Sequence, residues 1–231
     1  MIRLDKYLAH LKYGTRKEVK KIIRSGAVRV NGEVIRNDDY KIDETTDEVI
    51  YDGFVLDYQE YYYLMMNKPD GYVSSNKDEL DPSILNLVFE PYAFDLQCVG
   101  RLDVDTKGLL ILTNDGKFNH AVTAPKRHVE KEYVMELEKP LSENDIQQLY
   151  AGVSIDDDLS KALSIKVIDE ASYAMVIDEG KYHQVKRMMH AVNNEVLALK
   201  RIRIGALYLD ENLEEGEYRA LTKTEVEVLG G

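Results

Sequence analysis

One segment constrains the fold of this chain more than any other: residues 99–116, VGRLDVDTKGLLILTNDG, in which charged residues lead directly into an apolar run. The run 108–113 has the length of a buried strand, and 114–116 carry a turn signal after it. Acidic residues two positions apart at the entry to a buried strand are not needed for solubility. Asp103 and Asp105 are therefore candidate functional residues.

The composition excludes several classes of protein. The 231 residues are 44% hydrophobic and 31% charged, which is typical of folded globular chains and not of disordered ones. The single cysteine, Cys98, excludes an internal disulfide framework and fits a reducing compartment. Residues 1–14 lack the apolar stretch of a signal peptide, and no apolar run is long enough to span a bilayer. We therefore expect a soluble, cytoplasmic protein without a membrane partner.

Charge is distributed unevenly along the chain, whose net charge is −12. Residues 1–36 carry ten Lys or Arg and three Asp or Glu, a net charge of +7, whereas residues 37–60 carry −8. Such a basic head on an acidic body indicates a phosphate-bearing partner for the head.

The basic head is predicted to be a helix pair followed by a hairpin. Apolar residues at helical spacing predict helices over 3–12 and 16–24, and Thr15 with Glu18 forms a capping-box pattern before the second. Asn-Gly at 31–32, between alternating apolar residues, predicts a two-residue hairpin turn. The basic side chains of the second helix form either a solvated face or, as we favour, a phosphate-binding face. These side chains are Lys17, Lys20, Lys21 and Arg24.

The body mixes strands and helices without a regular β–α–β alternation. Predicted strands include 61–69, 108–113, 132–138, 173–177 and 197–204. Predicted helices cover 80–89, 142–150, 183–191 and 222–228.

The expected fold is therefore α+β. A small N-terminal helix-pair-plus-hairpin domain is expected over 1–56. A mixed, mostly antiparallel sheet domain is expected over 57–231, and we predict that 52–60 forms the linker region.

Common metal-binding and catalytic patterns do not fit. A calcium loop that begins at Asp103 would place Lys107 at a ligand position, the histidines and the cysteine show no zinc-ligand spacing, and no phosphate loop or nucleophile triad is recognisable. For Asp105, turn formation is the favoured interpretation. Asp103 can be fixed by the strand that follows and kept ionised by Arg101, which suits a nucleophile or general base.

The segment GRLDVDTKGLLILTNDG resembles the signature of pseudouridine synthases, and most closely those that act on ribosomal RNA and carry a basic N-terminal domain named after a ribosomal small-subunit protein. Further family segments follow in order: LMMNKPDGYVSS, HVEKEYVMELEKPL, EGKYHQVKRMMHAVNNEV and LKRIRIGALYLDENLEEGEYRALT. The resemblance thus covers essentially the whole chain. EGKYHQVKRM is most similar to enzymes of the RsuA type, which modify one uridine in small-subunit ribosomal RNA.

This resemblance implies isomerisation of a specific uridine to pseudouridine, without a cofactor or a metal. Asp103 would be the essential aspartate, Tyr133 would stack on the uracil, and Lys186 would pair with the catalytic carboxylate. Arg101 would orient Asp103 or take the place of the flipped nucleotide. Arg187, beside Lys186, would contact RNA.

Basic residues near the pocket would bind the phosphates that flank the flipped nucleotide. The candidates are Lys126, Arg127, Lys181, Lys186, Arg187, Lys200, Arg201 and Arg203. Lys107 would add a phosphate contact or face water.

The expected partner is small-subunit ribosomal RNA or its assembly intermediate, bound by a monomer. Three alternatives remain: a synthase for large-subunit ribosomal RNA, a non-enzymatic RNA-binding assembly factor, and a metal-dependent phosphoesterase that uses Asp103 and Asp105. The joint presence of Asp103, Tyr133 and Lys186 favours the enzyme, since a binding factor does not need this combination.

Overall fold

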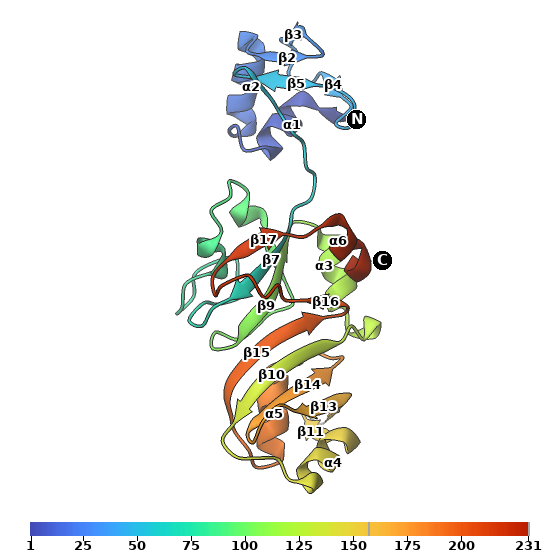
Figure 1. Ribbon diagram of the computed structural model, residues 1–231. Coiled ribbons are helices and arrows are strands. Elements are labelled where there is room, and N and C mark those ends of the chain that lie inside the picture. Colours follow the sequence, from blue (N-terminus) through green and yellow to red (C-terminus); the bar gives the residue numbers. More distant parts are fainter. Residues whose placement is uncertain (157, 231) are drawn as a thin grey trace. The chain divides into compact units, whose positions relative to one another are not determined.

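The computed structural model describes residues 1–156 and 158–230, which divide into two compact units. The first unit consists of Met1–Tyr61 with Glu90–Tyr92, and the second of Tyr62–Phe89 with the chain from Ala93 onwards. Figure 1 shows the elements of each unit. The first unit extends to Tyr61, beyond the domain end predicted at residue 56.

The first unit packs two helices against short strands. Its helices are α1 (Leu4–His10) and α2 (Arg16–Ser25). A four-stranded sheet has the order β3 (Glu33–Ile35), β2 (Val28–Val30), β5 (Val49–Tyr51), β6 (Phe54–Val55), and β1 (Ile2–Arg3) pairs with β4 (Lys41–Ile42). The predicted capping box is present: the Thr15 hydroxyl accepts from the Glu18 amide, and the Glu18 carboxylate accepts from the Thr15 amide.

The prediction that 52–60 is a linker is wrong. Phe54–Val55 forms β6 and pairs with β5, and Leu56 is buried in the core of the first unit. The Tyr58 ring stacks on the ring of Tyr7 with 4.8 Å between centroids. A linker was predicted because acidic residues around this hairpin outnumber its few apolar positions.

The second unit is built on one sheet of nine strands. The main order is β13-β14-β10-β15-β9-β7-β17, with β16 beside β15 and β8 beside β9. The strands are β7 (Tyr63–Lys68), β8 (Gln97–Val99), β9 (Lys107–Thr113), β10 (Lys131–Leu137), β13 (Ser164–Val167), β14 (Ser172–Ile177), β15 (Val196–Ile204), β16 (Leu207–Tyr208) and β17 (Tyr218–Ala220). A separate hairpin joins β11 (Val153–Ile155) to β12 (Asp158–Ser160).

Short helices accompany this sheet. The α-helices are α3 (Gly116–Thr123), α4 (Glu143–Ala151), α5 (Gln184–Ala191) and α6 (Lys223–Gly230), and the 3-10 helices are η1 (Ile84–Leu87), η2 (Ala93–Asp95) and η3 (Pro125–Arg127). Instead of the helix predicted over 80–89, only η1 forms. Charged residues and Pro82 before it leave too few consecutive apolar positions for a longer helix.

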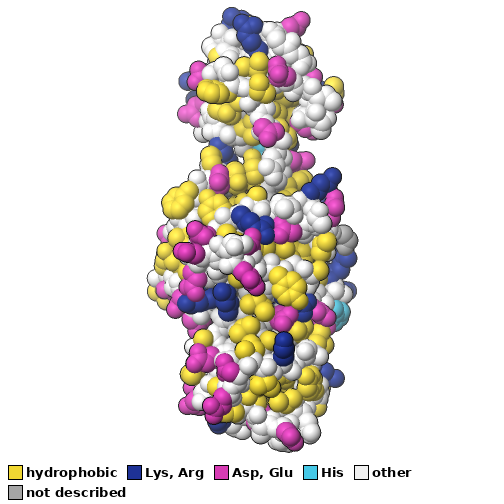
Figure 2. All heavy atoms as spheres, in the orientation of Figure 1, with side chains coloured by type: hydrophobic (Ala, Val, Ile, Leu, Met, Phe, Trp, Pro, Cys, Tyr) yellow, Lys and Arg dark blue, Asp and Glu magenta, His cyan; other side chains and the backbone are white. Residues whose placement is uncertain are grey.

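One hydrophobic core cluster of the second unit lies where β7, β8 and β9 meet α3 and α6. Its buried side chains include Met65, Leu109, Ile111, Phe118 and Leu229. On the face of this unit shown in Figure 2, acidic and basic side chains are interspersed rather than gathered in two separate patches. No helix in the described ranges is long and apolar enough to cross a membrane.

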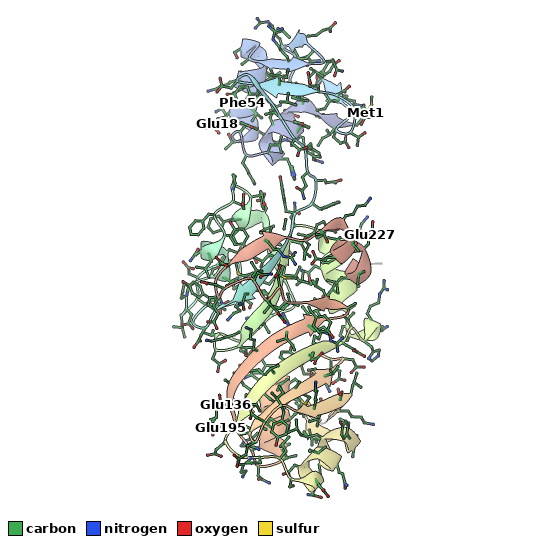
Figure 3. The ribbon with its side chains drawn as sticks, viewed as in Figure 1. Met1, Glu18, Phe54, Glu136, Glu195 and Glu227 are labelled. Atoms are coloured by element: carbon green, nitrogen blue, oxygen red, sulfur yellow. The ribbon has the colours of Figure 1, made fainter. Side chains whose placement is uncertain are left out.

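The central strands of the sheet determine where the site residues lie. β10 lies between β14 and β15 and pairs antiparallel with both, and Glu136 and Glu195 mark the end of the β10–β15 pair (Figure 3). β15 then runs parallel to β9, with Arg201 opposite Gly108, whereas the other pairings in the described part of this sheet are antiparallel. The two halves of the sheet therefore join at Gly108.

Gly108 cannot be replaced without strain. Its φ is +99°, and an added Cβ would collide with the backbone carbonyl of Arg201. We expect Gly108→Ala to lower the free energy of unfolding by about 2–3 kcal/mol, measured by urea denaturation. Gly116→Ala is the matched control, since a Cβ there meets no atom within 4 Å and Gly116 lies in a helix. Equal stability of the two variants would contradict this account of the strand junction.

Candidate active site

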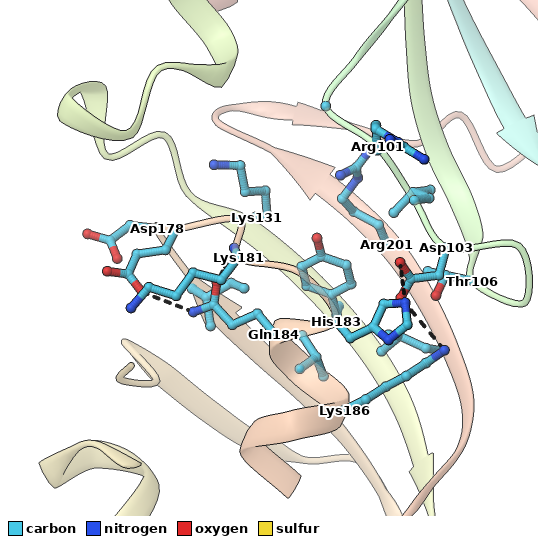
Figure 4. Close-up of a pocket in the computed structure, with 18 of the residues that line it drawn as sticks. Arg101, Asp103, Thr106, Lys131, Asp178, Lys181, His183, Gln184, Lys186 and Arg201 are labelled. Carbon is cyan, nitrogen blue, oxygen red and sulfur yellow. Dashed lines mark hydrogen bonds and ion pairs between the residues drawn. The ribbon is translucent and has the colours of Figure 1, made fainter. Parts of the chain in front are cut away.

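The loop that joins β8 to β9 enters a cavity of about 470 Å³ in the second unit. This volume lies within the range of small-molecule sites. Residues from β10, β14, β15 and the start of α5 form the other walls (Figure 4). The charged lining residues are Arg101, Asp103, Lys131, Asp158, Asp178, Glu179, Lys181, Lys186 and Arg201.

Asp103 lies between two basic groups in this cavity. Its Oδ1 is 3.3 Å from Nε2 of His183, and its Oδ2 is 3.7 Å from Nζ of Lys186 (Figure 4). The carboxylate side chain is only 28% exposed, so these groups act on it with less screening than at an open surface. The carboxylate therefore faces the cavity within ion-pair distance of both groups.

Lys186 contacts a second carboxylate as well. Its Nζ donates a hydrogen bond to Oδ1 of Asp105 at 2.5 Å, which is shorter than its distance to Asp103. Partial burial acts to raise the pKa of Asp105, but the hydrogen bond and the charge of Lys186 outweigh it, and the pKa is lowered. The predicted turn role for Asp105 is therefore incomplete, because this residue also holds the ammonium of Lys186.

The backbone of the Asp103 loop is held by residues 68–74. The ammonium of Lys68 is fully buried and donates hydrogen bonds to the carbonyl oxygens of Pro69, Val104 and Thr106 at 2.9–3.0 Å. The Ser74 hydroxyl donates to the carbonyl of Leu102 and accepts from its amide. The segment LMMNKPDGYVSS thus positions the aspartate loop from a neighbouring strand.

Tyr133 lies on the wall of the cavity that β10 forms. It is a central residue of β10, is 8% exposed, and pairs in register with Arg201 of β15. The aromatic ring therefore offers a rigid apolar surface within a polar cavity.

Two further residues form the cavity: His183, which the sequence did not single out, and Arg201. His183 precedes α5 in the left-handed region, with φ of 50° and ψ of 34°, and its ring stacks on the exposed ring of Tyr182. A left-handed conformation costs a non-glycine residue roughly 1–2 kcal/mol, so surrounding contacts must hold His183 in place. Arg201 was expected at a phosphate-binding surface, but only 3% of it is exposed.

The other predicted RNA-contacting residues are distributed over both units. Arg101 is exposed and lines the cavity, whereas Arg187 lies outside its lining and pairs with Asp156. In the first unit, Lys17 and Lys21 are exposed on α2, and Lys20 and Arg24 both pair with Asp38.

Two of the expected phosphate contacts are engaged within the protein. Arg203 pairs with Glu130 and Glu132, and Lys107 pairs with Glu215. None of these three partners is near in sequence, so the pattern of charges could not reveal these pairs.

Comparison with known proteins identifies the family. Residues 62–191 match the family model described as RNA pseudouridylate synthase. The chain belongs to this family. Residues 2–49 match the S4 domain, so the small N-terminal domain implied by the resemblance is confirmed, as is the mixed sheet of the synthase domain.

Relatives match over the full length. The chain is 42% identical to the ribosomal small subunit pseudouridine synthase A of Salmonella typhimurium, over 99% of this chain and 100% of the relative. It is also 42% identical to an uncharacterised RNA pseudouridine synthase of Bacillus subtilis, over 99% and 98%. A crystal structure of a pseudouridylate synthase superposes with a TM-score of 0.70 at 41% identity, covering 99% of this chain and all of the other. This pseudouridine synthase is therefore an isomerase, as expected.

The burial of Lys68 predicts how the stability of this synthase depends on pH. Burial lowers the pKa of Lys68 from 10.5 to about 8, so between these pH values the unfolded chain binds more protons than the folded one. Lys68 therefore contributes an increase of about 3 kcal/mol in the free energy of unfolding as the pH rises from 8 to 10.5. Lys68→Met lacks this contribution. Urea denaturation of both proteins at the two pH values tests it; a stability difference that does not change with pH would contradict it.

Proposed function

We propose that this enzyme converts one specific uridine of small-subunit ribosomal RNA to pseudouridine, with Asp103 as the essential aspartate. The observation that carries the proposal is the position of Asp103 in the cavity, between His183 and Lys186. The names of the full-length relatives support the choice of small-subunit RNA.

The residues of the cavity suit this reaction. The bond between ribose and the uracil nitrogen must break, the base must turn, and a ring carbon must bond to the ribose instead. Asp103 can act as nucleophile or as base, and the ammonium of Lys186 lies 3.7 Å from its carboxylate. Tyr133 can stack on the uracil and hold it while it turns.

The substrate uridine must leave its stack to enter the cavity, because a base within folded RNA cannot reach Asp103. Arg101 is exposed and lines the cavity, so it can orient Asp103 or occupy the place of the extruded base. Lys181 lines the cavity and pairs with Asp158, and Arg187 lies outside the lining and pairs with Asp156. RNA phosphates can replace those two partners.

The first unit supplies binding rather than chemistry. Lys17, Lys20, Lys21 and Arg24 of α2 form a basic face that suits the backbone of structured RNA. We therefore assign RNA binding to the N-terminal domain, predicted over 1–56, and catalysis to the remainder. We further infer that the enzyme acts in the cytoplasm as a monomer, on naked RNA or on an assembly intermediate.

Asp103→Asn tests the proposed reaction. We expect product formation to fall by more than about 10³-fold, with unchanged RNA affinity and thermal stability. The measurement is carbodiimide-based primer extension on small-subunit ribosomal RNA, supplied as transcript and as partly assembled particle. Asp105→Asn is the matched control. Product formation should fall less in this variant, because Asp105 acts only through Lys186.

A single primer-extension stop with wild type and none with Asp103→Asn would support the proposal and identify the uridine. A stop only on large-subunit RNA would show that small-subunit RNA is not the substrate. Activity of Asp103→Asn close to wild type would reject the assigned role of Asp103.

Substitution of the exposed α2 lysines tests the role of the first unit. We expect the double variant Lys17→Gln/Lys21→Gln to weaken RNA binding on the order of 10-fold. The slope of log K against the logarithm of the salt concentration should become shallower by about 2. The maximal rate at saturating RNA should not change, since α2 is not part of the cavity. The salt dependence of binding is the readout, with Lys166→Gln on β13 as the control. An unchanged salt slope would show that α2 does not bind phosphates.

A further inference from the structure

His183 occupies a position where the backbone favours other residues. It precedes α5 with φ of 50° and ψ of 34°, in the left-handed region that glycine or asparagine adopts at lower cost. Among the described residues, its side chain makes no capping hydrogen bond to α5. It therefore does not replace the serine, threonine or aspartate that commonly precedes a helix. Neither the turn nor the helix requires a histidine here.

The imidazole of His183 contacts the carboxylate of Asp103. Two basic groups of the described residues lie within ion-pair distance of this carboxylate, and His183 is the nearer one (Figure 4). Its Nε2 is 3.3 Å from Oδ1, whereas Nζ of Lys186 is 3.7 Å from Oδ2. Lys186 makes its shorter contact with Asp105, at 2.5 Å. The closest side-chain support for Asp103 from a basic group is thus His183.

The ring of Tyr182 restrains the imidazole. The two ring centroids are 3.7 Å apart, and the ring planes differ by 20°. Tyr182 is 74% exposed and is not part of the cavity lining, so its ring does not serve the core. Stacking of this kind limits the rotation of the imidazole and leaves its edge free to contact Asp103.

We propose that His183 is a positioning residue, which holds the Asp103 carboxylate through Nε2 in the orientation that meets the uridine. The terminal torsion of an aspartate has broad minima, so a carboxylate without this contact spends less time in the reactive orientation. The unfavourable backbone conformation of His183 is then retained for reactivity rather than for stability. This inference rests on the proposed reaction at Asp103, but not on which ribosomal RNA supplies the uridine.

Two substitutions of His183 test the role of Nε2. The amide nitrogen of glutamine can reach the position of Nε2, whereas that of asparagine reaches only the position of Nδ1. We expect kcat to fall on the order of 10²-fold in His183→Asn, with KM within about 3-fold of wild type. His183→Gln should recover kcat to within about 10-fold of wild type. The measurement is the release of tritium from the uracil carbon that bonds to the ribose, on the ribosomal RNA that wild type modifies.

His128→Asn is the matched control. His128 also has a left-handed backbone, with φ of 50° and ψ of 37°, and its Nδ1 lies 2.8 Å from Asp178, but it is not part of the cavity lining. Its kcat should stay within about 3-fold of wild type. Because asparagine tolerates the left-handed region, neither asparagine variant should lower the unfolding temperature by more than about 3 °C.

A kcat of His183→Asn close to that of wild type would overturn the proposal. So would an equal loss in His183→Gln, or a loss in His183→Asn that is matched by His128→Asn or by a lower unfolding temperature. In these cases the histidine would have no positioning role through Nε2, or only a structural one.

The contact can also be tested without catalysis. In histidine-labelled protein, Asp103→Asn should shift the ¹⁵N resonance of Nε2 of His183 and leave the resonances of His128 unchanged. An unchanged His183 resonance would overturn the proposal. A shifted resonance in an enzyme that forms no product on ribosomal RNA would support the contact and reject the proposed function, so the two failures are distinguishable.

Discussion

The buried ammonium of Lys68 is the interaction on which the rest of the active site depends. Its three hydrogen bonds join the end of β7 to the carbonyls of Val104 and Thr106, on either side of Asp105 and directly after Asp103. A lysine can donate three hydrogen bonds and accept none, so one side chain saturates the carbonyls that a sharp turn leaves exposed. The position of the Asp103 carboxylate follows from this anchored turn.

Oppositely charged side chains lie close together in the second unit. The body is acidic overall, yet the cavity is lined by Lys131, Lys186 and Arg201 together with Asp103. Lys186 bridges Asp103 and Asp105, whereas no carboxylate of the described residues lies within ion-pair distance of Lys131 or Arg201.

Much of the fold could be predicted because it is encoded by local patterns. The apolar run of β9, the alternation of β10 and the capping box at Thr15 each reflect the geometry of a single element. Elements with few apolar residues, such as β1, β4 and the β11–β12 hairpin, were not predicted, and β6 was mistaken for linker. Their stability comes from pairing with distant strands, which leaves little trace in the local sequence.

The sequence by itself determined the family, the basic helix of the first unit and the segments that carry Asp103, Tyr133 and Lys186. Only the tertiary structure decided what surrounds those side chains. It brought His183 to 3.3 Å from Asp103, buried Lys68 beneath the turn, and placed Arg201 opposite Tyr133 without an acceptor for Nη2. The reason is physical: the charge balance of a side chain depends on neighbours contributed by strands distant in sequence, and residue spacing along the chain does not contain those distances.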